Sequence, residues 1–166
     1  AGFGPRLDAC FAHAQDRIPA MSQSGTFSDM DLVCRAVDRF HRLLRAVTGY
    51  AELNRSGRWS VVAAALTKAA SERIEPKLRN VGPDMNMALR RREGNDRVDG
   101  DQILAALNGV YLLATVRDSR DSLAVNAVFD QVWAQTGQAL EIHIERNLEA
   151  LRRNPADAMS SARLDA

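Results

Sequence analysis

Apolar residues recur at alternating steps of three and four through most of the chain, which is the spacing of one face of an α-helix. In the first segment these positions are Leu7, Phe11, Ala14, Ile18 and Met21. In the second segment they are Val33, Val37, Phe40, Leu44, Val47 and Ala51. Residues 22–26 separate the two, with Gly25 as the helix breaker and Thr26 or Ser28 as the N-cap of the second helix. Such series indicate long helices packed at small angles.

A third helical segment starts at Trp59 and contains two prolines. Its apolar positions continue at Leu66, Ala70, Ile74, Leu78 and Val81. Pro76 removes a backbone donor and kinks or stops a helix, and Gly82-Pro83 is the stronger break. The pattern favours a break at that pair, followed by a short helix with Met85, Ala88 and Leu89. The alternative is a single kinked helix over residues 59–92.

Two further helical segments follow a polar loop over residues 93–100. The apolar positions of the first are Ile103, Leu107, Val110 and Ala114, supported by Leu104 and Tyr111. Those of the second are Val125, Phe129, Val132, Thr136, Leu140, Ile144, Leu148 and Leu151. We expect both series to face the core. Asp99 and Asp101 are expected to cap the first of these helices and to meet its positive dipole end.

These segments predict an all-α fold, an antiparallel helical bundle of four to five main helices, with the third segment either broken or kinked near Pro76 and Pro83. No internal repeat or change of composition divides the chain, so residues 1–154 are expected to form a single domain. The helical spacing stops after Asn154-Pro155, and residues 155–166 are expected to be a flexible C-terminal tail. No stretch contains the roughly 20 apolar residues of a membrane span, so none is expected.

Composition and charge narrow the classes of partner. The chain has 22 basic and 21 acidic side chains, a net charge of +1 and 5% aromatic residues. That balance gives no global field for a polyanion, and few aromatics are available to stack on bases, so a nucleic-acid partner is not expected. Of the 22 basic residues 20 are arginine, and two groups of them are locally concentrated. The candidate binding residues are Arg35, Arg39, Arg42 and Arg45 in one group and Arg90, Arg91 and Arg92 in the other.

His41 lies beside the first arginine group and offers the clearest suggestion of chemistry. An exposed imidazole next to cations is what a phosphotransfer histidine requires. Residues 41–53, from His41 through Gly-Tyr-Ala-Glu to Leu53, resemble the phosphoacceptor helix of sensor histidine kinases. Here the distance from histidine to glycine is shorter than in that family, and the proline that usually follows the histidine is absent. The resemblance implies phosphotransfer at His41. The other interpretation is a boundary histidine beside arginines that pair with acids of a neighbouring helix.

The remaining residues with reactive or ligating side chains form no recognised motif. Cys10 and Cys34 occur outside any Cys-x-x-Cys pair and are predicted to be small buried thiols that do not form a disulfide. Placing Gly100 at the invariant glycine of a calcium loop leaves its last ligand position without a carboxylate. The three histidines, His13, His41 and His143, do not occur in the paired motifs of bundle metal sites. We therefore expect no metal and no cofactor.

Because no motif for chemistry is present, the sequence favours a non-enzymatic helical module for protein–protein interaction or regulation, with a protein partner or a second copy of itself. Trp59 and Trp133 are expected to be core anchors, with a partner-facing role as the alternative. Phosphotransfer through His41 is the first alternative function. A small-ligand-binding or enzymatic domain with a pocket between helices is the second. The compartment stays open, with the cytoplasm favoured.

Overall fold

The computed structural model describes residues 3–23, 25–50, 57–90 and 99–165, and within them the chain forms α-helices joined by short turns, two of them 3-10. In chain order the elements are α1 (Phe3–Arg17), η1 (Pro19–Ser22), α2 (Phe27–Tyr50), α3 (Arg58–Leu89), α4 (Gly100–Asp118), η2 (Arg120–Ser122), α5 (Asn126–Arg153) and α6 (Ala158–Asp165). The predicted all-α bundle is confirmed. Its described part has six α-helices, where four to five main helices were predicted. Of these helices, none combines the length and apolarity that a membrane span requires.

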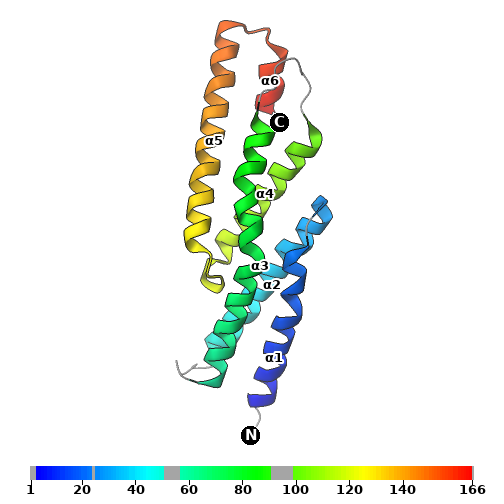
Figure 1. Ribbon diagram of the computed structural model, residues 1–166, viewed down its shortest axis with the longest axis vertical. Helices are drawn as coiled ribbons and strands as arrows, with labels where there is room; N and C mark the ends of the chain where they lie inside the picture. Colours follow the sequence, from blue (N-terminus) through cyan, green and yellow to red (C-terminus); the bar gives the residue numbers. More distant parts are fainter. Residues whose placement is uncertain (1–2, 24, 51–56, 91–98, 166) are drawn as a thin grey trace.

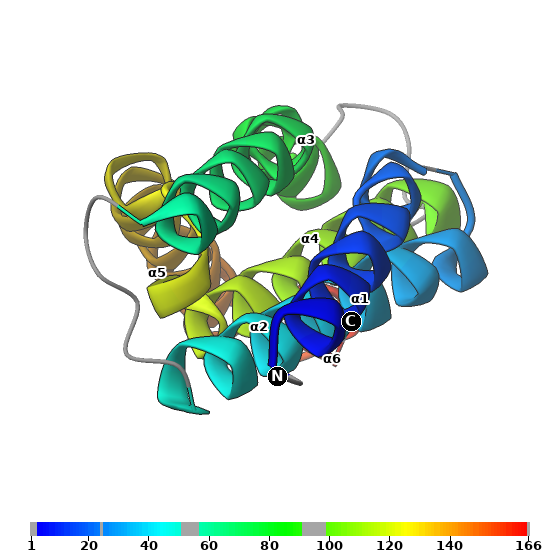
Figure 2. The ribbon, with the colours of Figure 1, turned by 90° about the horizontal axis from the view of Figure 1, so that it is seen from below.

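Helix α3 runs through the middle of the molecule and contacts most of the other elements (Figure 1). Helices α1 and α2 pack on each other beside its lower half, and α4 crosses behind it. The view from below shows α4 between α3 and α2 (Figure 2). Helix α5 lies along the other side of α3 and carries α6 near its upper end. We call α1, η1, α2 and the lower half of α3 the N-terminal bundle, and α5 with α6 the C-terminal arm.

The starts of α2 and α4 follow the predicted signals. Gly25 has a φ of 143°, a conformation that side chains with a Cβ rarely adopt, so it separates α2 from the preceding turn. Thr26 comes next as the predicted N-cap, and the Asp29 carboxylate accepts a hydrogen bond from its N–H at 3.3 Å. At α4 the Asp99 carboxylate accepts from the N–H groups of Asp101 and Gln102, which confirms the predicted cap.

Helix α3 continues without a break from Arg58 to Leu89, so the predicted break at Gly82-Pro83 is wrong and the single helix is correct. Each proline in a helix interior costs about 3 kcal/mol. Beyond Pro76 and Pro83, however, the helix still buries Leu78, Val81 and Met85 against its neighbours. Burying side chains of this size stabilises the helix by about 1.5–3 kcal/mol each, which offsets the cost of the prolines.

The N-terminal bundle buries the apolar series that its sequence predicts. The buried members are Phe11, Ala14, Ile18, Met21, Val33, Val37, Phe40, Leu44, Val47, Leu66, Ala70 and Ile74, and the series continues up α3 with the buried Leu78 and Val81. Trp59 is half-buried at the edge of this core, where its ring stacks on Phe11 with centroids 5.5 Å apart. Trp59 is therefore a core anchor, as predicted. Ala51, the last position of the second series, lies outside the described residues.

Residues 158–165 form α6 in the region for which a flexible tail was predicted. The Asp157 carboxylate accepts hydrogen bonds from the N–H groups of Met159 and Ser160 and so caps the helix. The Ser160 side chain is fully buried, and the His143 imidazole of α5 is hydrogen-bonded to the Arg163 carbonyl at 3.1 Å. The small polar residues of α6 thus form a helix where they pack on α5. The assignment of residues 1–154 to one domain stays a prediction.

Candidate functional site

The predicted arginine stripe lies on the solvent side of α2, where all four of its members are exposed. Arg35 pairs with Asp31 at 2.7 Å and Arg42 with Asp38 at 3.0 Å, each one helical turn away. Within the described part of the chain, Arg39 and Arg45 form no ion pair. Both ion pairs found in the described part of the stripe therefore use acids of α2 itself. Exposed pairs of this kind contribute only about 0.3–0.5 kcal/mol each.

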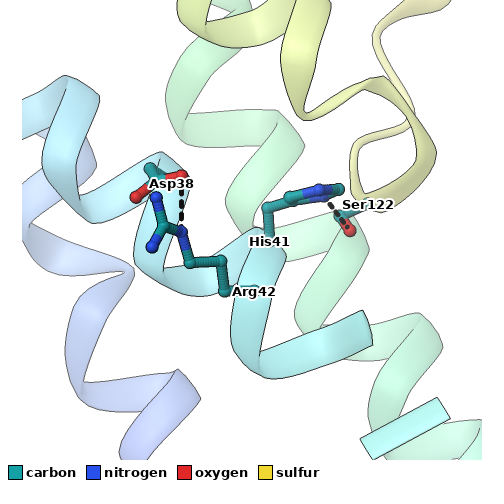
Figure 3. A network of polar contacts seen from close by, with 4 residues as sticks. All are labelled: Asp38, His41, Arg42 and Ser122. Atoms are coloured by element: carbon teal, nitrogen blue, oxygen red, sulfur yellow. Dashed lines mark hydrogen bonds and ion pairs between the residues drawn. The ribbon is translucent and has the colours of Figure 1, made fainter. Parts of the chain in front are cut away.

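The His41 side chain points away from this stripe. Its Nδ1 lies 2.9 Å from the Ser122 hydroxyl in η2, and the ring is half-buried. Figure 3 shows Arg42 turned toward Asp38 on the other side of the helix. The structure therefore does not bring Arg42 to the imidazole, although a phosphotransfer site would use such a cation. Residues 51–53, the end of the kinase-like segment, lie outside the described residues.

His41 instead helps to fix the connection between α4 and α5. His41 contacts Ser122 on one side of this connection. On the other side, the Ser71 hydroxyl of α3 accepts a hydrogen bond from the Ala124 N–H at 2.8 Å. The same hydroxyl donates to the Thr67 carbonyl at 2.6 Å. Side chains from α2 and α3 thus hold the α4–α5 corner, a role that agrees with a boundary histidine.

The second arginine group is described only in part. Arg90 is exposed at the end of α3, whereas Arg91 and Arg92 lie outside the described residues. Figure 1 shows the end of α3 above α2. Arg90, the described member of the second group, therefore lies apart from the arginine stripe of α2.

Helix α4 carries the largest departure from the predicted burial. Its apolar series was expected to face the core, but Leu107 is 53% exposed, and Leu104, Val110 and Tyr111 are exposed as well. The residues that α4 buries are Ala106, Asn108, Gly109, Leu112, Leu113 and Val116. The predicted orientation of α4 is therefore wrong. We call this series the α4 seam, which consists of the exposed Leu104, Leu107, Val110 and Tyr111 and the half-buried Ile103 and Ala114.

The close contact between α4 and α3 explains this orientation. A Cβ atom at Gly109 would lie 2.9 Å from Cγ1 of Val81, so the two helices approach there as closely as a glycine permits. The same face of α4 buries Asn108, whose Oδ1 has no hydrogen-bond partner in the described part of the molecule. Shape thus decides which face packs on α3, and a more apolar face is left outside.

The α4 seam is free of charge and extends onto α2. No Asp, Glu, Lys or Arg occurs from Gln102 to Val116. Phe27 of α2 stacks on Tyr111 with ring centroids 6.1 Å apart. The Tyr111 hydroxyl donates to the Asp31 carboxylate at 3.2 Å, and Asp31 also holds Arg35. One residue of the predicted arginine stripe therefore lies at the border of the α4 seam.

Helix α5 follows the prediction in its lower half and departs from it above. Phe129, Val132 and Thr136 are buried as expected. Higher up, the predicted core positions Leu140, Ile144 and Leu148 are exposed, Ile144 to 44%. The buried residues there are His143 and Asn147, with the Asn147 amide donating to the His143 carbonyl at 2.8 Å.

Trp133 of α5 is 47% exposed, so its prediction as a core anchor is wrong. Its ring stacks on the buried Phe129 with centroids 5.6 Å apart, and the Arg117 guanidinium lies 5.9 Å from its centre. Exposed tryptophan beside arginine is the composition of many binding hot spots. The partner-facing alternative fits this residue better.

The reactive groups are dispersed. Cys34 and Cys10 are both free thiols, the first buried and the second half-buried. Burial raises the pKa of the Cys34 thiol above its ordinary value, and a hydrogen bond with Thr115 opposes that shift. Burial, followed by the charge of Cys34 and contact with Asp31, raises the pKa of Tyr111. Over the described ranges, no group of three His, Cys, Asp or Glu side chains could hold a metal ion.

The two arginine groups and His41 were named from the sequence, but the outward α4 seam was not recognised as a surface. Its residues were assigned to the core because a helical series of apolar residues usually faces one. Comparisons of the chain with protein-family models, curated proteins and solved structures find no match.

Proposed function

We propose that the protein is a non-enzymatic helical module that binds another protein chain through the α4 seam. The observation that carries this proposal is the uncharged apolar series on the outside of α4. A helix that is apolar on all sides is usually enclosed by other elements. Here one side is covered by α3 and α2, and the other is open to a partner.

The spacing and composition of the α4 seam support a helical partner. Ile103, Leu107, Val110 and Ala114 follow steps of four, three and four, the pattern by which helices pack side by side in coiled coils. The centres of protein interfaces are depleted in charge and enriched in aromatic residues, and Tyr111 with Phe27 adds two rings. The Asp31–Arg35 pair supplies polar groups at the rim.

Site-specific photo-crosslinking tests this proposal. A photoreactive phenylalanine replaces Leu107 in the full chain, expressed in cells of its source, and the same residue replaces Val61 as the control. Val61 is also an exposed apolar side chain but belongs to α3. We expect crosslinks to a protein at position 107 and none at position 61. An intact chain that gives no protein adduct at position 107 would contradict the proposal.

Phosphotransfer at His41 has less support, because the imidazole is half-buried and contacts Ser122. If His41→Gln removed acid-labile phosphorylation of the chain, this function would take precedence. We expect His41→Gln to leave it unchanged. A small-ligand pocket between the helices stays a prediction from the sequence.

A further inference from the structure

We propose that the chain that covers the α4 seam is a second copy of this protein, in a symmetric dimer in which the two α4 helices pack antiparallel. This inference rests on the proposed function and names the partner at the same surface. Three properties of the α4 seam favour a second copy: its spacing, its lack of charge and its area.

The spacing of the α4 seam is the same in both directions. From Ile103 to Ala114 the steps are four, three and four, so an antiparallel copy places seam residues opposite seam residues. Ile103 then faces Ala114 of the second copy, and Leu107 faces Val110 of the second copy. A two-fold axis requires this kind of reciprocal contact, in which residue i meets j and j meets i. Each pair also places a larger side chain opposite a smaller one, isoleucine opposite alanine and leucine opposite valine.

The absence of charge removes the main obstacle to self-association. Around a two-fold axis each group comes close to its own copy, so a charged stripe would repel itself. The α4 seam has no charged side chain between Gln102 and Val116. The exposed apolar residues of α5 differ, because Glu141 and Glu145 lie between and beside them. The arginine stripe of α2 would also be unfavourable next to itself.

The area of the α4 seam suits one side of a dimer interface. By their exposed fractions, the seam and Phe27 present roughly 400 Å² of side-chain surface, while one side of a standard interface buries about 800 Å², of which about 57% is apolar. The seam and Phe27 therefore supply most of the roughly 450 Å² of apolar area that one side of such a dimer needs, with Asp31 and Arg35 at its edge.

The mass of the full chain in solution tests the inference. We measure it by sedimentation velocity over a dilution series that extends to high micromolar concentration. We expect a species of twice 18.3 kDa. Leu107→Glu is expected to keep its helical circular dichroism but to weaken dimerisation at least about 100-fold, because a charge buried between apolar faces loses its water. Leu104→Glu repeats the test at a second position of the seam.

Two further samples make the test specific. Leu148→Glu introduces the same charge at an exposed apolar position of α5 and is expected to stay dimeric. Leu107→Lys alone is expected to be monomeric, whereas an equimolar mixture with Leu107→Glu is expected to recover the dimer, because the two positions 107 lie on either side of the axis, only three residues apart along the paired helices, where a lysine and a glutamate can form an ion pair. Recovery of this kind requires position 107 of both chains to lie in the interface.

Three outcomes would overturn the inference. The wild-type chain could remain at 18.3 kDa at every concentration, Leu148→Glu could dissociate the dimer while both α4 variants do not, or the mixture could stay monomeric. If the wild type is monomeric but position 107 crosslinks to a different protein, only the second-copy partner is wrong. If it is monomeric and position 107 gives no adduct, the proposed function fails too.

Discussion

The N-terminal bundle and the C-terminal arm differ in which side chains they bury. In the bundle, the buried positions of α2 are apolar and include Val33, Val37 and Phe40. In the upper half of α5, His143 and Asn147 are inside while Ile144 is outside. Both helices have apolar residues at helical spacing, so the spacing predicts a helix in each case. Which face becomes buried depends on the neighbours that the fold supplies.

The neighbours of the two regions explain the difference. The apolar face of α2 is covered by α1, η1 and α4, and η2 contacts the same helix. Helix α5 packs mainly on α3, and its upper part is covered by α6, a helix of eight residues. The α6 backbone supplies a polar partner, the Arg163 carbonyl, and the side of α5 that carries His143 turns toward it. Helix α4 contacts α2 and α3 on one side and α5 at its end, and it leaves its own apolar series outside.

The strongest test of the comparison pairs a truncation in each region. Phe40→Ala removes a fully buried ring and is expected to lower the free energy of unfolding by about 3–5 kcal/mol. Ile144→Ala removes a side chain that is 44% exposed and is expected to cost less than about 1 kcal/mol. Urea denaturation of dilute protein measures both. Equal losses would mean that the upper side of α5 is buried, contrary to the structure.

Two glycine substitutions test why α4 turns its small residues toward α3. Gly109→Ala is expected to destabilise the fold by about 1–3 kcal/mol, since the new Cβ would lie 2.9 Å from Val81. Gly137→Ala on α5 is the matched control, because no atom lies within 4 Å of its Cβ position. That control is expected to stabilise the helix by about 0.5–1 kcal/mol. Thermal or urea unfolding measures the stability change of each variant. A stabilising Gly109→Ala would refute the close contact between α4 and α3.

A substitution at His143 tests the polar contact that docks α6. His143→Phe removes the ring nitrogen that is hydrogen-bonded to the Arg163 carbonyl, with an expected cost of about 1–2 kcal/mol. We expect faster amide hydrogen exchange in α6 and unchanged exchange in α2. His13→Phe, at an exposed position of α1, is the control and should change neither. Unchanged exchange in α6 after His143→Phe would show that other contacts hold this helix.

The smallest expected effect concerns pH and the core of the N-terminal bundle. The pKa of the Cys34 thiol is raised in the folded chain above its ordinary value of 9.0, so this group favours folding below that value and loses its contribution as the pH rises above it. The stability of the wild type should therefore fall, relative to Cys34→Ala, by at most about 1.4 kcal/mol per pH unit. Denaturation curves of both chains from neutral to alkaline pH measure this. Parallel curves would contradict the burial of Cys34.

Local signals in the sequence predict much of the fold. Gly25, the cap at Asp99 and the apolar series of α1, α2 and α3 depend on residues within one or two turns, and the structure agrees with them. The course of α3 through Pro83 could not be predicted, because side chains of other helices stabilise it. Helix α6 was missed because its small polar residues form a helix only where α5 receives them.

The exposure of the α4 seam also could not be predicted from local signals in the sequence. Every residue of the α4 seam was recognised as part of a helical series, yet assigned to the core. The contact that reverses the assignment, Gly109 with Val81, joins residues that are distant in sequence. For the arginine stripe, Asp31 lies one turn before Arg35 and could have been recognised as its partner from the spacing alone.

The hydrogen bonds at the α4–α5 corner have a consequence for the far end of the molecule. Helix α5 has 28 residues, so it extends about 42 Å from the corner at 1.5 Å per residue. A tilt of about 10° at the corner would displace its upper end by roughly 7 Å. The hydroxyl groups of Ser122 and Ser71 therefore form their hydrogen bonds at the end of α5 where a small tilt has the largest effect on the opposite end. Their bonds to His41 and Ala124, together with the packing of α5 on α3, hold the lower end of the helix that carries α6.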